Sequence, residues 1–336
     1  MNAVRIPFRY APGVALCLLV SALAAALEHV ELAVFGRAWI ESLVLAILIG
    51  TLVRTLVPLP AAADKGIAFS AKTLLEVAIV CLGASISLGA IRDAGPALVV
   101  GIAAVVVVAL AVGYGIGRAL GLPARLATLV ACGNAICGNS AIVAAAPAIK
   151  AEADDVAAAI AFTAVLGIAV VLLLPLLQVA LALSPAQHGV LAGLTVYAVP
   201  QVLAATAPVG PLSVQVGTLV KLVRVLMLGP VVVALGLVAG RAGDVKLSPA
   251  RMVPWFVLGF IAMMLLRSAE LLPAAVLPPL AHAADWLTVL AMAGLGLTVN
   301  LRSVLFAGGR VISAATLSLV VLGLVSAGLI ALLHIG

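Results

Sequence analysis

The sequence predicts an all-α polytopic membrane protein with about 11 transmembrane helices. Of its 336 residues, 65% are hydrophobic and 9% are charged, and the mean hydropathy is +1.37. An ordinary soluble domain carries roughly a quarter charged residues. Because a membrane-spanning helix needs ~20 predominantly apolar residues, this length holds about 11 spans with short loops and no room for a separate soluble domain.

The composition also excludes several classes of function. In a soluble protein a formal net charge of +6 would suggest nucleic acid, but in a membrane protein Lys and Arg mark the cytoplasmic side, so no nucleic-acid partner is expected. The four cysteines lie in apolar segments and the four histidines lie at segment ends, so we expect neither a disulfide framework nor a bound metal. No catalytic motif occurs, which disfavours an enzyme.

The first apolar stretch, 14–27, follows Arg5 and Arg9 and ends in a run of small residues. This pattern predicts an uncleaved first span, and it also fits a cleaved secretory signal. Both interpretations stay open. The further spans are bounded by prolines, glycines and charges, and they are predicted at 39–57, 72–88, 97–120, 126–149, 156–183, 190–208, 213–238, 252–272, 286–305 and 312–333.

The distribution of positive charge supports this count. With the N-terminus inside, 12 of the 18 Lys and Arg residues fall in the inner loops and ends, four fall in the outer loops, and two lie inside a span. Lys and Arg in short loops accumulate on the cytoplasmic side. The count therefore predicts a cytoplasmic N-terminus and a C-terminus on the opposite side of the membrane.

The whole chain, 1–336, is predicted to be a single transmembrane domain with an internal repeat. If 1–36 is an extra N-terminal helix, then 37–185 and 186–336 form two five-helix repeats. An odd number of helices inverts the second repeat relative to the first, an arrangement that many transporters share.

The fourth helices of the two repeats then correspond, at 126–149 and 286–305. Each carries paired glycines at mid-span, near Gly138 and Gly296, with Asn and a hydroxyl residue close by. Irregular backbone at membrane depth is tolerated where protein or a water-filled cavity covers it. We therefore predict two broken helices that cross.

Half-helix ends at such a break can hold an ion through their dipoles and free backbone groups. The alternative is structural, since small residues permit close packing and interhelical hydrogen bonds contribute roughly 1 kcal/mol per pair. The candidate ligands are the polar and glycine residues of the two segments: Asn134, Gly138, Asn139, Ser140, Thr298 and Asn300.

Lys221 and Arg224 lie inside the span 213–238. A rise of ~1.5 Å per residue puts them roughly 12 Å and roughly 16 Å from its outer end. Snorkelling to the interface is the alternative, and it suits Arg224 less well. Intramembrane charges usually face the bundle interior or a cavity, so we expect both cations to attract a substrate.

Glu76 is the only acid well inside a predicted span. It can form a helix-end pair with Lys72, pair with Lys221 or Arg224, or carry a proton as a coupling group. Counting only deep charges leaves two cations against one acid, which favours an anionic substrate.

The span 190–208 adds a proline at 200 in its middle, which frees a backbone carbonyl. Tyr197 and Gln201 share one face of this helix and could line a cavity. A plain structural kink explains the proline equally well.

These residues resemble the YeiH-type family of bacterial inner-membrane proteins, which are described as sulfate exporters. The resemblance implies a multi-pass secondary transporter in the inner membrane, with a cytoplasmic N-terminus and a periplasmic C-terminus. It also implies a fold related to the bile-acid/sodium symporter group. The segments that carry it lie at 135–138, 140–142, 146–147, 173–177, 201–202, 220–226 and 296–302.

We therefore expect a transporter of a small anion, such as sulfate or a sulfonate, that works by alternating access. Na+ or H+ is the candidate coupling ion, no other cofactor is expected, and a homodimer stays open. One alternative is a sodium- or proton-coupled importer of organic acids. Another is a membrane scaffold or subunit that does not transport.

Overall fold

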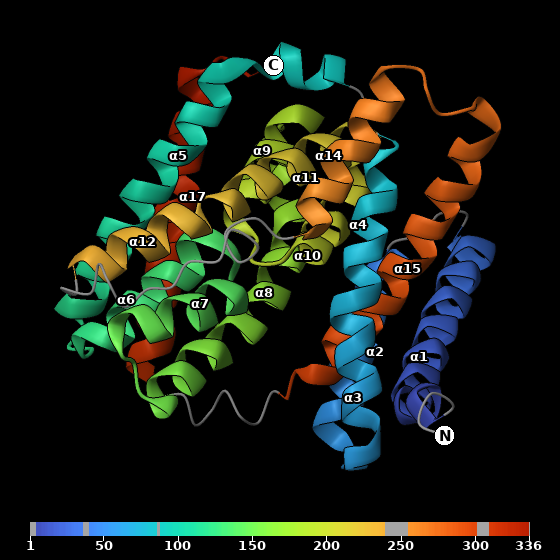
Figure 1. Cartoon of the computed structure of the whole chain (residues 1–336), viewed down its shortest axis with the longest axis horizontal. Coiled ribbons are helices and arrows are strands. Elements are labelled where there is room, and N and C mark those ends of the chain that lie inside the picture. The colour runs from blue at the N-terminus through green and yellow to red at the C-terminus, as the bar shows by residue number, and fades with distance from the viewer. Residues whose placement is uncertain (1–4, 36–39, 86–87, 239–254, 301–308, 336) are drawn as a thin grey trace. The chain divides into compact units, whose positions relative to one another are not determined.

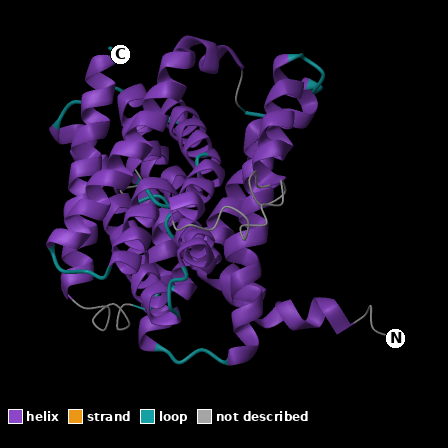
Figure 2. Cartoon of the chain, turned by 60° about the vertical axis from the view of Figure 1, so that its left-hand side comes forward, coloured by secondary structure: helices purple, strands orange, loops and turns teal. Residues whose placement is uncertain are grey.

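A computed structural model of the chain describes residues 5–35, 40–85, 88–238, 255–300 and 309–335. This part of the chain is built from helices and contains no strand (Figure 2). Seven of its helices are long and apolar enough to cross a membrane, and several shorter apolar helices accompany them. The chain divides into two compact units: unit 1 comprises 1–90 and 255–302, and unit 2 comprises 91–254 and 303–336.

Unit 1 contains helices from both ends of the chain. Within it, α15 packs against α1, α2 and α4, and α14 packs against α4 (Figure 1). The π-helical turn η1 joins α3 and α4 into one continuous helix. The elements are α1 (Arg5–Phe35), α2 (Ser42–Leu56), α3 (Ala61–Phe69), η1 (Ser70–Leu74), α4 (Leu75–Gly83), α14 (Trp255–Ser268), the 3₁₀ turn η4 (Ala274–Val276) and α15 (Leu277–Thr298).

Close packing in unit 1 depends on glycines. A Cβ atom on Gly296 of α15 would lie 2.4 Å from the carbonyl oxygen of Ile47 in α2. A Cβ atom on Gly50 of α2 would lie 2.7 Å from the carbonyl oxygen of Ala293. Small residues let membrane helices approach this closely.

The predicted break near Gly296 is therefore wrong. Helix α15 continues through Gly294 and Gly296 and ends only after Thr298. Gly296 lets the backbone of α2 approach, and Gly294 lets the backbone of η1 approach. Both glycines therefore serve close packing.

Two predicted spans in unit 1 are also shifted along the chain. The helix expected at 72–88 runs over Ala61–Gly83, because it restarts directly after Pro60 closes the connection from α2. The helix expected at 286–305 begins at Leu277, where two prolines occupy its first turn. Proline is favoured there, because the first N–H groups of a helix have no partner within the helix.

Helix α1 belongs to the packing of unit 1. It contacts α2, α3 and α15, and Cys17 and Ala24 on its inner face are fully buried. This packing favours the uncleaved first span over the cleaved signal.

Unit 2 has an apolar core to which α5 through α11 and α17 contribute. Its helices are seen in green, yellow and red in Figure 1. The elements are α5 (Leu88–Ala119), which begins at the boundary, α6 (Ala124–Cys132), η2 (Gly133–Cys137), α7 (Asn139–Ile149), α8 (Ala153–Ala180), α9 (Pro185–Thr195), α10 (Val199–Thr206), the 3₁₀ turn η3 (Ala207–Val209), α11 (Pro211–Leu226), α12 (Leu228–Val238) and α17 (Gly309–Leu332).

Unit 2 contains two interrupted helices. The first runs through α6 and the π-helical turn η2, breaks at Gly138 and resumes as α7. This break agrees with the sequence prediction. The second is interrupted at 196–198, between α9 and α10, where the sequence suggested a kink or a cavity lining. The two inverted repeats stay a prediction.

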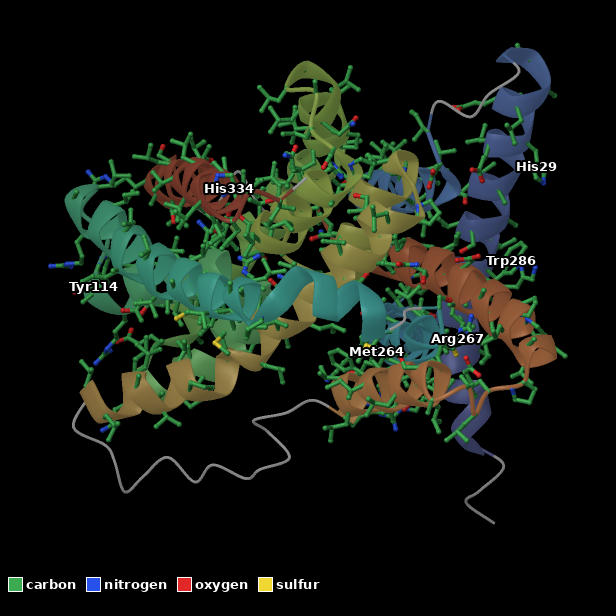
Figure 3. The ribbon with its side chains drawn as sticks, turned by 90° about the horizontal axis from the view of Figure 1, so that it is seen from above. His29, Tyr114, Met264, Arg267, Trp286 and His334 are labelled. Carbon is green, nitrogen blue, oxygen red and sulfur yellow. The ribbon has the colours of Figure 1, made fainter. Side chains whose placement is uncertain are left out.

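The outer faces of both units carry apolar and aromatic side chains. Tyr114 on α5 and Trp286 on α15 lie at the periphery of their units (Figure 3). Tyrosine and tryptophan are enriched where a membrane meets water, because their rings are apolar with one polar end. Both side chains suit a surface that faces lipid.

Replacing Gly296 tests the packing of unit 1. Gly296→Val would drive a branched side chain into the backbone of α2, and overpacking of this kind costs ~1–3 kcal/mol. We expect the thermal unfolding midpoint of the detergent-solubilised protein to fall by about 5 °C.

The control is Gly328→Val in α17, because a Cβ atom there would meet open space. That variant should unfold within about 1 °C of the wild type. Equal midpoints for the two variants would contradict the packing described for α2 and α15.

Candidate functional site

Gly138 forms the first interruption. Its backbone angles are φ +62° and ψ −125°, a conformation that glycine adopts far more readily than residues with a side chain. Its N–H donates to the carbonyl of Gly133 at 2.9 Å, across the π-helical turn. A Cβ atom on Gly138 would lie 3.1 Å from the Cβ atom of Tyr197. Glycine is therefore needed both for the turn and for the approach of the second interruption.

The second interruption is an extended segment between two short helices. Helix α9 ends at Thr195, and α10 begins at Val199 with a proline in its first turn. The side-chain oxygen Oε1 of Gln201 accepts a hydrogen bond from the N–H of Ala198 at 3.2 Å. Gln201 is buried, and through this hydrogen bond it caps the N-terminus of α10.

Asn134 joins the two interruptions. Its Oδ1 accepts a hydrogen bond from the Tyr197 hydroxyl at 2.8 Å. Its Nδ2 donates to the carbonyl of Ala315 in α17 at 2.9 Å. Phe162 from α8 packs edge-on against the ring of Tyr197 at a centroid distance of 6.2 Å. Asn134, expected as a ligand, uses both ends of its amide to connect three parts of unit 2.

The Arg224 guanidinium from α11 lies between the two interruptions. It is fully buried. Its Nε donates to the carbonyl of Ala135 at 2.7 Å, and Nη2 donates to the carbonyl of Asn134. On the other side, Nη1 donates to the carbonyls of Gly193 and Val196 at 3.3 and 3.1 Å. One side chain thus binds the end of η2 and the end of α9 together.

Lys221 makes the same connection one turn earlier on α11. Its Nζ donates to the carbonyl of Ile136 at 2.7 Å and to the carbonyl of Val196 at 2.8 Å. It too is fully buried. The sequence predicted that both cations would face an anionic substrate, whereas their immediate neighbours in the structure are backbone carbonyls.

The electrostatic reason lies in the direction of the half-helices. The carbonyls that bind the cations belong to the C-terminal ends of α6–η2 and of α9, and a helix C-terminus carries about −0.5 elementary charge. Isolated charges are costly to bury unless a partner compensates them. Among the side chains of unit 2 that the structure describes, carboxylates occur only at 152–155, beside α8, where Glu152 pairs with Arg125 at 3.1 Å. The helix ends are therefore the main compensation for Lys221 and Arg224.

The opposite half-helix, α7, begins with polar groups that are accessible. Asn139 and Ser140 are exposed, although the residues just before them are buried. The first N–H groups of a helix have no partner within it, and a helix N-terminus attracts anions. The beginning of α7 is thus a polar, electropositive and accessible surface.

Thr163 is a site residue that the sequence did not single out. Its hydroxyl contacts Oδ1 of Asn139 and lies 2.8 Å from the carbonyl of Ile160. It comes from the middle of α8 and is buried. A lone hydroxyl in the apolar span 156–183 was the available signal.

The predicted site residues fall into two groups. Seven lie in unit 2 around the two interruptions: Asn134, Gly138, Asn139, Ser140, Gln201, Lys221 and Arg224. Three lie in unit 1: Glu76, Thr298 and Asn300.

The three residues in unit 1 have their own surroundings. Glu76 on α4 accepts a hydrogen bond from the indole N–H of Trp255 at 2.8 Å. Thr298 donates to the carbonyl of Leu295 at 2.6 Å, at the end of α15. Their roles in coordination and coupling stay predictions.

A family model described as conserved hypothetical protein 698 matches residues 12–315. The chain belongs to this family. Its members are named UPF0324 membrane proteins, and one from Agrobacterium fabrum is 57% identical over 96% of this chain and 92% of the relative. One from Brucella melitensis is 59% identical over 96% and 91%, and one from Bacillus cereus is 37% identical over 88% and 84%. No solved structure matches.

Membership of UPF0324 confirms the resemblance to the YeiH-type proteins. Together with the long apolar helices, it makes the chain a multi-pass membrane protein. The printed names of the UPF0324 relatives state no substrate.

Replacing Arg224 tests its role in holding the two interruptions together. Arg224→Gln removes the charge and most of the donors, which leaves buried carbonyls without partners at a cost of about 1–3 kcal/mol. We expect the thermal midpoint to fall by about 5 °C or more. We call the contact between the two interruptions the crossing. We also expect the cysteine in η2, Cys137, to react faster with a small maleimide as the crossing loosens.

The matched control is Arg125→Gln. Arg125 pairs with Glu152 at the surface, where its side chain is 48% exposed, and exposed pairs contribute at most about 1 kcal/mol. A stability loss for Arg224→Gln no greater than that of the control would show that the carbonyl contacts do not hold the crossing.

Proposed function

We propose that the protein is a secondary transporter of a small anion. The observation that carries this proposal is the pair of buried cations, Lys221 and Arg224, placed at two interrupted helices away from any described carboxylate of unit 2. Discontinuous membrane helices are a recurring way to build a transport site near the middle of the bilayer.

The charge balance at the interruptions favours an anion over a cation. The two side chains contribute two positive charges, and the C-terminal ends of η2 and α9 offset about one of them. The N-terminal ends of α7 and α10 add about half a positive charge each. A visiting anion would therefore find a positive field in an interior of low dielectric, where charge interactions are strong.

The structure supports a division of roles among the candidate residues. Asn139 and Ser140 are accessible and lie at the start of α7, so we assign them the direct contacts with the anion. Lys221 and Arg224 bind carbonyls, so we assign them the field that attracts it.

The supporting residues position these groups. Asn134 and Gln201 fix the second interruption, Gly138 permits the close approach, and Thr163 orients the Asn139 amide.

The two interrupted helices of unit 2 support alternating access, because discontinuous helices recur at the substrate sites of transporters that work in this way. The excess of Lys and Arg in alternate loops supports an N-terminus in the cytoplasm and a C-terminus in the periplasm of the bacterial inner membrane. Sulfate and sulfonates are the anions to examine first, because of the YeiH-type resemblance. Importing an organic acid with Na+ or H+ would use the same residues, and dependence of uptake on either gradient distinguishes it.

Anion flux in proteoliposomes tests the proposal. The purified protein is reconstituted, and exchange of radiolabelled sulfate and methanesulfonate is measured with equal concentrations on both sides. Wild-type protein should exchange at least one of them faster than empty vesicles. Asn139→Ala combined with Ser140→Ala should reduce exchange about tenfold, because lost contacts worth ~1.4 kcal/mol weaken binding by that factor.

The control is Thr128→Ala. Thr128 is partly exposed on α6, where its hydroxyl bonds to the carbonyl of Ala124 in the same helix. That variant should exchange anions as the wild type does. Unchanged exchange in the Asn139 and Ser140 double variant would remove these residues from the site. Absence of wild-type exchange for both anions would refute the proposed transport of these anions and favour a scaffold.

A further inference from the structure

We infer that Lys221 exchanges a proton during each transport cycle and so couples anion movement to proton movement. The inference rests on the proposed anion transport and names its coupling ion. It depends on one juxtaposition: a fully buried lysine amine, held by two backbone carbonyls, beside a permanently charged guanidinium.

The first argument is the number of hydrogen bonds. An ammonium group has three N–H donors, whereas a neutral amine has two. The structure gives Nζ of Lys221 two acceptors, the carbonyls of Ile136 and Val196. These two carbonyls pair both N–H donors of the neutral amine, and they pair two of the three donors of the ammonium. The side chain can therefore lose a proton without leaving a carbonyl unpaired.

The second argument is the contrast with Arg224. A guanidinium stays charged in proteins, whereas a buried lysine can change its charge state. Arg224 uses its planar fork to hold four carbonyls, which is a constant structural task. The crossing keeps one positive charge at all times through Arg224, and Lys221 is free to supply or withdraw the second.

The third argument is the cost of changing buried charge. With Lys221 protonated and one negative charge bound, the two side chains and the anion sum to one positive charge. With the anion gone and Lys221 neutral, the sum is again one positive charge. Proton and anion leaving together therefore spare the interior a change in net charge, which would be costly at low dielectric.

Three titratable groups lie near Lys221. On its own helix the neighbour is Arg224, and from the other elements the thiol of Cys137 and the phenol of Tyr197 face the two cations. Cys137 is partly exposed and lies beside the hydroxyl of Ser140, which is exposed. His188, elsewhere on the α9–α11 contact, bonds to Ser213 at 2.9 Å.

The step is balanced in atoms and charge. The N–H bond of the Lys221 ammonium breaks, the proton passes to water on the side where the anion is released, and a neutral amine remains. Binding of the next anion is accompanied by uptake of one proton from the same side as that anion. Proton and anion thus move in the same direction.

Luminal pH in proteoliposomes tests this inference. Vesicles contain a pH-sensitive dye and sulfate or methanesulfonate, and potassium with valinomycin clamps the membrane potential. Both are anions of strong acids, so neither carries a proton through the lipid itself. Dilution into anion-free buffer should raise the luminal pH as protons leave with the anion, at about one proton per anion for methanesulfonate.

Lys221→Gln separates coupling from transport, because its amide keeps two N–H donors and carries no charge. Anion exchange should fall, because the charge that attracts the anion is lost, and the number of protons that move with each exchanged anion should fall at least tenfold. Lys221→Met, which is also neutral, serves as the second variant should Lys221→Gln fail to give a monodisperse protein.

The outcomes are distinguishable. Wild-type anion efflux without a change in luminal pH overturns the coupling and leaves anion transport standing. Proton movement that survives in a folded Lys221 variant removes Lys221 from the role. Absence of any anion exchange in the wild type instead overturns the proposed transport of these anions on which the inference rests.

Discussion

Lys221 and Arg224 bind the carbonyl ends of two half-helices, and the arrangement of unit 2 depends on that contact. Each interruption exposes backbone groups that a membrane interior cannot hydrate, and each cation needs compensation for its burial. The contact gives the exposed carbonyls hydrogen-bond donors and gives the buried cations a compensating partial charge, so it lowers both free-energy costs. Because the cations come from a third helix, α11, the contact also fixes how three helices meet.

Around this contact, other buried polar side chains form hydrogen bonds that hold the two interruptions in place. Asn134 and Tyr197 bond across the two interruptions, and Asn134 also reaches α17. Gln201 caps α10. These groups are buried and paired, whereas Asn139 and Ser140 are open. The polar residues of the segment thus separate into those that maintain the crossing and those that stay accessible at the start of α7.

The helical class, the position of almost every apolar segment and the break at Gly138 could be predicted from hydropathy and glycine placement. The second break could be predicted only as a kink, because Pro200 indicates an irregular helix but not how many residues leave the helical conformation. The break predicted near Gly296 was wrong, since the same glycine pattern serves close packing against α2 and η1. The carbonyl partners of Arg224 could not be predicted from the sequence, because every residue carries a backbone carbonyl.

The π-helical turn η2 has a consequence for how this protein tolerates insertions and deletions. A π turn holds one residue more than the α-helical path it replaces. Loss of one residue there would restore the ordinary α-helical winding and leave the helix downstream close to its present orientation, whereas the same loss in a regular α-helix would rotate everything downstream by about 100°. The π-type hydrogen bond from Gly138 to Gly133 would be replaced by an α-helical one, and the carbonyls of η2 that bind Lys221 and Arg224 would change direction. The extra residue of this segment therefore serves the contact with α11.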